Sequence, residues 1–154
     1  MLPKYHIVTG LIASVFIFVM FPSITILDAS IIFFSSFLID FDHYLYYILI
    51  KNDYSLNRAY KWFIAKNKYL LNLKKEQRAK YKNTILIFHG IEFWLLLLVL
   101  ALINKLFIWV LVGISIHMLL DYIELTINKN PFYMKFSQVY TFFSNLHKKP
   151  LENY

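Results

Sequence analysis

The hydrophobic pattern of the chain consists of four long apolar runs separated by polar stretches. The runs cover residues 5–21, 24–50, 84–103 and 106–127. Each approaches or exceeds the roughly 20 residues that a helix needs to cross the hydrocarbon core of a bilayer. Short connections at 21–23 and 104–105 join the runs in pairs. The pattern therefore predicts an all-α integral membrane bundle, in which four transmembrane helices form two hairpins within a single domain.

The first of these runs follows Lys4 and has the length of a secretory signal. It lacks the small-x-small pattern that precedes signal cleavage, so we expect it to be retained as a span. The chain is also 59% hydrophobic, which is more than a soluble domain of 154 residues needs. Both features favour a membrane protein.

The polar stretch between the hairpins, residues 51–83, is strongly basic. It holds ten Lys and Arg residues against Asp53 and Glu76. Short loops rich in Lys and Arg stay on the cytoplasmic side of a membrane, and Lys4 and Lys149 near the two ends agree with that side. We therefore expect a multi-pass protein of the cell (inner) membrane with both termini in the cytoplasm.

The basic stretch interleaves its charges with apolar side chains such as Tyr60, Trp62 and Phe63. An amphipathic helix lying on anionic lipid headgroups explains this mixture. The tail, residues 128–154, is interrupted by Pro131 and is expected to form another surface helix. The net charge of +7 also suits nucleic acid, but the basic residues flank the apolar runs, which disfavours that partner. Membrane lipids are the expected partners, and a homo-oligomer remains open.

Ionisable residues inside apolar runs are costly and usually functional. On the predicted topology they lie in the cytoplasmic half of their helices, except Asp28, which is expected in the first turn at the outer end. These residues are His6, Asp40, Asp42, His43, His89, Glu92, His117, Asp121 and Glu124. A lone histidine in such a run is more often a packing residue, so it is their common depth that favours a polar functional centre.

The spacing of these residues is selective as well. Asp40 and His43 are three residues apart, and His117 and Asp121 are four apart, spacings that place side chains on one helix face. His89 and Glu92 are likewise three residues apart, so we expect a third helix to present such a pair. Helical bundles build metal sites from such inward His and carboxylate pairs. The chain has no cysteine, so the ligands would be oxygen and imidazole, which suit zinc, manganese or iron, as one ion or two.

Four segments resemble the YdjM-type family of inner-membrane metal-dependent hydrolases. "YHIVTGLIAS" looks like the family's opening "GH" segment, "FLIDFDHYLYY" is similar to its "LPDIDH" motif, and "VGISIHMLLDYIE" is similar to "GYLSHILAD". "IFHGIEFW" falls where the family has "HRGFTHS". There are two departures: Ile39 replaces the proline of the second motif, and His89 with nearby Glu92 replaces the histidine pair of the third.

The resemblance implies a divalent metal, zinc above all, and a helical site like those of zinc-dependent phospholipase C and P1-type nucleases. The ligand set would be His6, Asp40, His43, His89, His117 and Asp121. Asp42 and Glu92 would supply a further ligand or the general base, and Glu124 would lie behind the ligands or at the entrance. The expected substrate is a phosphoester or phospholipid at the cytoplasmic leaflet. Two alternatives remain: a membrane protein that translocates metal or protons, and a non-catalytic metal-binding scaffold.

Overall fold

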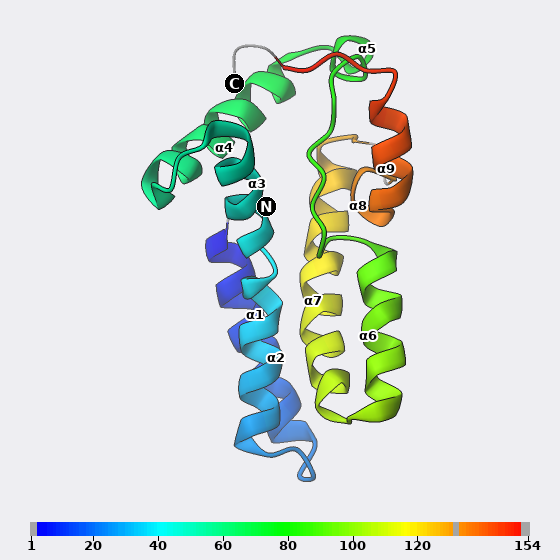
Figure 1. Ribbon diagram of the computed structural model, residues 1–154. Coiled ribbons are helices and arrows are strands. Elements are labelled where there is room, and N and C mark those ends of the chain that lie inside the picture. The colour runs from blue at the N-terminus through cyan, green and yellow to red at the C-terminus, as the bar shows by residue number, and fades with distance from the viewer. Residues whose placement is uncertain (1–2, 131–132, 152–154) are drawn as a thin grey trace.

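The computed structural model describes residues 3–130 and 133–151, and these fold almost entirely into helices (Figure 1). In chain order the helices are α1 (Pro3–Met20), α2 (Ile26–Leu38), α3 (Phe41–Lys51), α4 (Leu56–Asn72), α5 (Lys75–Arg78), α6 (Ile91–Ile103), α7 (Leu106–Ile127), α8 (Tyr133–Phe136) and α9 (Gln138–Asn145). The described residues contain no strand, only one isolated bridge between Tyr81 and Lys149. The all-α prediction is confirmed.

Two antiparallel hairpins form the long axis of the molecule (Figure 1). Helices α1 and α2 make one hairpin, α6 and α7 make the other, and α2 and α7 pack against each other at the centre. Asp28 lies in the first turn of α2, where it forms a capping box with Thr25: Asp28 N donates to Thr25 Oγ1, and Asp28 Oδ2 accepts from Thr25 N. The two hairpin turns lie at one end of the molecule, and α4, α5 and α9 lie at the other.

Small residues allow the central helices to approach closely. A Cβ atom on Gly113 of α7 would lie 2.4 Å from the carbonyl oxygen of Ile32 on α2, and one on Gly10 of α1 would lie 1.8 Å from Ser36 Oγ. Such close small-residue contacts are typical of helix pairs in membranes, where association depends on packing and not on apolar burial. Next to them, Ile39, Leu97, Ile114 and Met118 form a small buried core.

Two of the predicted spans differ from continuous helices. The run 24–50 is divided into α2 and α3 by a turn at Ile39 and Asp40, and the run 84–103 becomes helical only at Ile91. By length and composition, α1 and α7 are the helices that could cross a membrane, and α6 is a shorter apolar helix of 13 residues. The structure thus supports two possible spans, and the arrangement of four spans in two hairpins remains a prediction.

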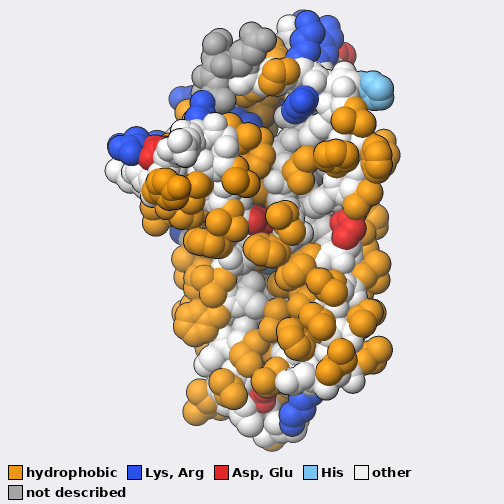
Figure 2. Space-filling view, in the orientation of Figure 1, with side chains coloured by type: hydrophobic (Ala, Val, Ile, Leu, Met, Phe, Trp, Pro, Cys, Tyr) orange, Lys and Arg blue, Asp and Glu red, His pale blue; other side chains and the backbone are white. Residues whose placement is uncertain are grey.

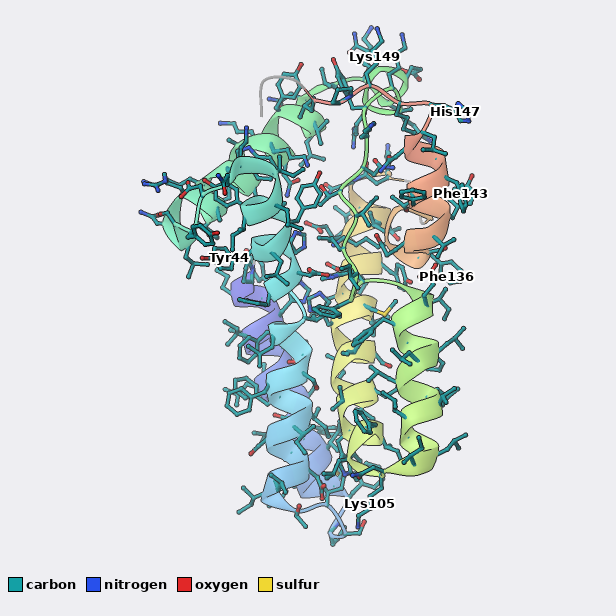
Figure 3. All side chains as sticks on the ribbon, viewed as in Figure 1. Tyr44, Lys105, Phe136, Phe143, His147 and Lys149 are labelled. Carbon is teal, nitrogen blue, oxygen red and sulfur yellow. The ribbon has the colours of Figure 1, made fainter. Side chains whose placement is uncertain are left out.

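The surface around the hairpins is apolar (Figure 2). Large hydrophobic side chains are exposed along α1, among them Val8, Ile12 and Phe16, and along α6, among them Leu102 and Ile103. Charged side chains gather at the end that carries α4 and α5, while Lys105 marks the opposite end (Figure 3). This distribution favours a bilayer around the hairpins.

The tail forms two short helices instead of the single surface helix that the sequence predicts. Helix α9 buries its polar side chains and exposes its aromatic ones: Gln138, Thr141 and Asn145 are buried, while Phe142 and Phe143 are more than half exposed. The buried amides bind the non-helical segment 83–90, which turns at residues 87–90. Asn145 pairs with the backbone of Asn83 through both side-chain atoms, and Gln138 accepts from Leu86 N and donates to the carbonyl of His89. Helix α9 thus fixes the segment that carries His89.

Candidate metal centre

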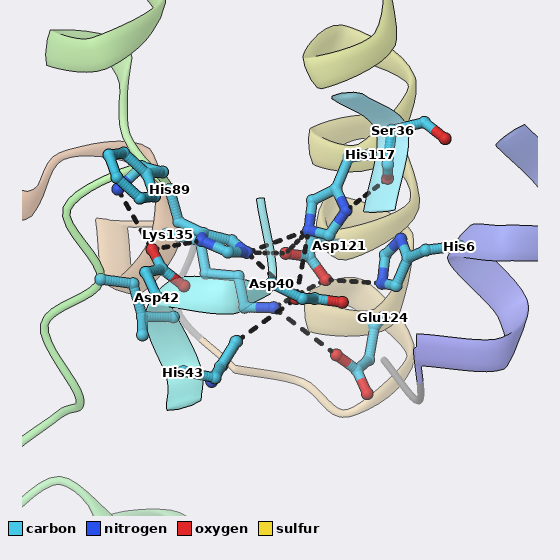
Figure 4. Close-up of polar contacts among 12 residues, drawn as sticks. His6, Ser36, Asp40, Asp42, His43, His89, His117, Asp121, Glu124 and Lys135 are labelled. Carbon is cyan, nitrogen blue, oxygen red and sulfur yellow. Dashed lines mark hydrogen bonds and ion pairs between the residues drawn. The ribbon is translucent and has the colours of Figure 1, made fainter. Parts of the chain in front are cut away.

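Polar side chains from both hairpins meet at the level where α2 gives way to α3 (Figure 4). His6 comes from α1, Asp40 from the turn before α3, Asp42 and His43 from α3, His89 from the segment before α6, and His117 and Asp121 from α7. His6, His89, His117 and Asp121 are at most 2% exposed. The structure therefore brings together seven of the residues that the sequence singles out.

The centre of the cluster is a triangle of three donor atoms. His89 Nε2 and His117 Nε2 are 2.9 Å apart, and Asp121 Oδ2 lies 3.6 Å from the first and 3.4 Å from the second. Ligands at about 2.0–2.2 Å from a tetrahedral ion are separated by about 3.3–3.6 Å. The two distances to Asp121 Oδ2 suit a single zinc-like ion, and the two histidine nitrogens lie closer together than in an ideal tetrahedron. Asp40 Oδ1 forms a similar triangle with the same two nitrogens, at 3.5 Å and 3.6 Å.

The other ring nitrogen of each histidine is held by an oxygen atom. His117 Nδ1 lies 2.8 Å from the carbonyl oxygen of Ser36, and a carbonyl can only accept, so Nδ1 carries the proton. His89 Nδ1 lies 3.0 Å from Asp42 Oδ2, which also accepts from Phe88 N. Metal-binding histidines typically donate their second N–H to a carboxylate or carbonyl in this way.

This arrangement leaves the two Nε2 atoms 2.9 Å apart with no proton assigned to either. With both protons on Nδ1, two neutral imidazoles this close repel each other unless they share a proton or both bind a cation beside them. Other buried groups of the cluster also lack hydrogen-bond partners among the described residues: both ring nitrogens of His6 and Asp40 Oδ2 have none there. Buried polar atoms are normally satisfied, so these groups fit a site that takes a metal ion.

His6 and His43 flank the triangle on different sides. The His6 ring stacks on His117 with centroids 3.9 Å apart, and its Nε2 is 3.6 Å from Asp121 Oδ1. The His43 ring meets His89 edge-on at 5.2 Å, and its Nε2 is 3.6 Å from Asp40 Oδ1. Both belong to groups whose donor atoms are close enough to share an ion, His6 with Asp40 and His117, and His43 with Asp40 and His89.

Lys135 is a member of the cluster that the sequence does not single out. Its Nζ lies 2.7 Å from Asp121 Oδ1 and 3.8 Å from Glu124 Oε2 (Figure 4). The ammonium group balances part of the negative charge of these carboxylates. Glu124 lies at the edge of the cluster, as expected. Lys135 follows Pro131 in a basic tail, and no spacing relation connects it to α7, so sequence reasoning could count it only as a surface charge.

Two residues take positions that differ from the expected ones. The Glu92 carboxylate accepts from Ser137 Oγ, Gln138 N and Val139 N, so it caps the start of α9 and does not join the cluster. The proposed ligand or base role of Glu92 is not supported by this placement, because residue 89 precedes α6 and the expected helical pairing with Glu92 is lost. Asp42 is buried behind His89, where it orients the ring.

No known protein family, curated protein or solved structure matches this chain at a significant level. A function for this chain is therefore inferred from the cluster itself. Its buried His and Asp side chains could hold a metal ion.

Proposed function

We propose that the protein is a membrane-bound, metal-dependent hydrolase whose site lies at the cytoplasmic face of the bilayer. One observation carries the proposal: the triangle of His89 Nε2, His117 Nε2 and Asp121 Oδ2, with both imidazoles tethered on their far sides. Three protein ligands and an open fourth position are typical of catalytic zinc sites, whereas structural zinc sites have four protein ligands. Zinc is the preferred ion in this proposal, with manganese or iron as the alternatives.

The residues around the triangle have distinct parts in this proposal. His89, His117 and Asp121 hold the ion, and Asp40 faces the same two nitrogens from its own side. A bound ion of this kind lowers the pKa of its water towards neutrality and polarises a phosphoryl oxygen. His43 is the best placed of the cluster residues to exchange a proton with a substrate, because its side chain is 29% exposed while His89 and His117 are enclosed.

A lipid-type phosphoester is the proposed substrate class. A cavity of about 150 Å³ extends from Asp40 and His43 along α4, with an apolar lining that includes Leu56, Tyr60 and Ile64. An acyl or prenyl chain would fit such a lining, and the exposed apolar surfaces of α1 and α6 support a position of the cluster near a bilayer. The resemblance to the YdjM-type hydrolases points to the same chemistry.

The test is hydrolysis by the purified full-length protein of p-nitrophenyl phosphate, bis-p-nitrophenyl phosphate and a fluorescent phosphatidic acid. Activity should require added zinc, manganese or iron, disappear with a chelator, and be lost in His117→Ala. Lys149→Ala, at an exposed position far from the cluster, is the control. The proposal would be contradicted if the metal-loaded wild type cleaves none of these substrates, or if His117→Ala cleaves them as fast as wild type does. Metal uptake into sealed vesicles would instead favour a transporter.

A further inference from the structure

A second cavity adjoins the cluster, and most of the charged residues in its lining are cations. Its volume is about 170 Å³, and it lies between α4, the segment 78–86 and the end of α7. Its lining includes Lys66, Arg78, Lys82 and Lys135, against Glu124 alone among acidic residues. His43 forms part of its wall, so the cavity reaches the metal centre. The metal chemistry proposed above does not account for this concentration of positive charge.

Lys66 is the most unusual of these cations because it is buried. It is only 5% exposed, its Nζ donates to Thr84 Oγ1 at 2.8 Å, and the ring of Trp62 lies 4.8 Å away. Within residues 3–130 and 133–151, no carboxylate oxygen lies within the 4.0 Å of Nζ that would make an ion pair. Buried charges are normally paired, so an ammonium enclosed by rings and one hydroxyl indicates a missing anion.

Arg78 is a second cation in the lining of this cavity, and it is half-buried. Its guanidinium donates to Asn130 Oδ1 and to the carbonyl of Leu73, both neutral groups, and its Nε has no partner among the described residues. Arginine is the side chain best suited to bind the oxygens of a phosphate, and lysine acts as a point charge beside it. Two cations that form no ion pair with a carboxylate in the described part of the chain therefore line one cavity next to the cluster.

We propose that this cavity binds a phosphate-type dianion, held by Lys66 and Arg78 beside the metal centre. The inference rests on the proposed function only in taking this anion to be part of the substrate or product. The cavity lies on the other side of His43 from the apolar one and shares Phe63 and Asn67 with it. The matching ligand is an amphiphile with an anionic head in the basic cavity and a hydrocarbon chain in the apolar one, or the free phosphate released from it.

The experiment uses the full-length protein, with and without added zinc, in two arms at constant ionic strength. One arm titrates inorganic phosphate into detergent-solubilised protein by calorimetry. The other arm compares thermal unfolding in phosphatidylcholine nanodiscs with and without phosphatidic acid. The variants are Lys66→Met, which removes the charge at similar length, and Arg78→Gln, which retains an amide for Asn130. Lys68→Met, exposed on the same helix, is the matched control.

Lys66→Met and Arg78→Gln should weaken phosphate binding by about tenfold or more, as expected for a lost charge-assisted hydrogen bond, while Lys68→Met binds like wild type. Binding in the first arm identifies a free anion, and a response only to phosphatidic acid identifies a lipid-borne one. Equal binding by all variants, or no response of wild type in either arm, overturns the inference. Lys66-dependent binding in a protein that takes up no metal would contradict the proposed function and leave the anion site standing.

Discussion

His89 Nε2 and His117 Nε2 face each other at 2.9 Å, although 28 residues separate them in the sequence. Each ring is fixed from behind, His89 by the Asp42 carboxylate and His117 by the Ser36 carbonyl. The two nitrogens that we propose bind the metal are thus held in position by the protein itself. A substitution that removes one of these orienting oxygens therefore tests the centre as directly as the substitution of a proposed ligand.

Asp42→Asn should weaken metal binding by about 10- to 100-fold while leaving every proposed ligand in place, because orienting partners of histidine ligands typically contribute that much. The amide can no longer present a charged oxygen to both Phe88 N and His89 Nδ1. Competition with a chromophoric zinc chelator measures the affinity. Asp53→Asn, which changes a carboxylate that binds Arg58, Tyr47 and Ser55 near the start of α4, is the control and should bind like wild type. Equal affinities for the two variants would contradict an orienting role.

Gln138→Ala should loosen the segment that carries His89. The change leaves Leu86 N–H and the His89 carbonyl without their partner, at a cost of about 1–3 kcal/mol for each group that stays buried. We expect a lower melting temperature and faster amide hydrogen exchange over residues 83–90. Val139→Ala, on the exposed side of the same helix, should change neither. Unchanged exchange in Gln138→Ala would show that α9 does not fix this segment.

The parts of this centre that the sequence predicts are those that a regular helix provides. His117 and Asp121 lie on one face of α7, whose bounds match the predicted run 106–127, and helical spacing alone places them together. His89 is different: the sequence of residues 84–90 resembles the start of a helix, but this segment is non-helical and is bound by α9. His89 pairs instead with Asp42. Asp42 lies in the first turn of α3, and Asp40 lies in the turn just before that helix. Such long-range pairings leave no local signal.

Lys66 predicts a specific dependence of stability on pH. Burial, with a smaller contribution from Lys51, lowers its pKa to about 8 from the usual 10.5. Between about pH 8 and 10.5 the unfolded chain keeps a proton that the folded chain has lost, so the free energy of unfolding rises with pH, by up to about 3 kcal/mol.

Thermal unfolding in phosphate-free detergent buffer at pH 7.5, 9 and 10 measures this dependence. Lys66→Met should lose the rise, and Lys68→Met should retain it. A wild-type stability that falls steadily over this range, with the same slope in Lys66→Met, would contradict a buried ammonium at this position.

The absence of cysteine makes the four-span topology directly accessible to labelling. Ser23→Cys and Asn104→Cys, in the two hairpin turns, should react with a membrane-impermeant maleimide added to intact cells. Lys68→Cys, on α4, should react only after the membrane is opened. Labelling of all three positions from outside, or of Lys68→Cys alone, would contradict the arrangement with both termini in the cytoplasm.

The most direct test of the central claim is the metal content of the detergent-purified protein, measured by mass spectrometry beside the His89→Ala/His117→Ala double variant. Near-stoichiometric zinc, manganese or iron should be present in the wild type after incubation with these metals and absent from the double variant. A folded wild type that stays free of all three metals, or a double variant that binds as much metal as the wild type, would contradict the metal centre.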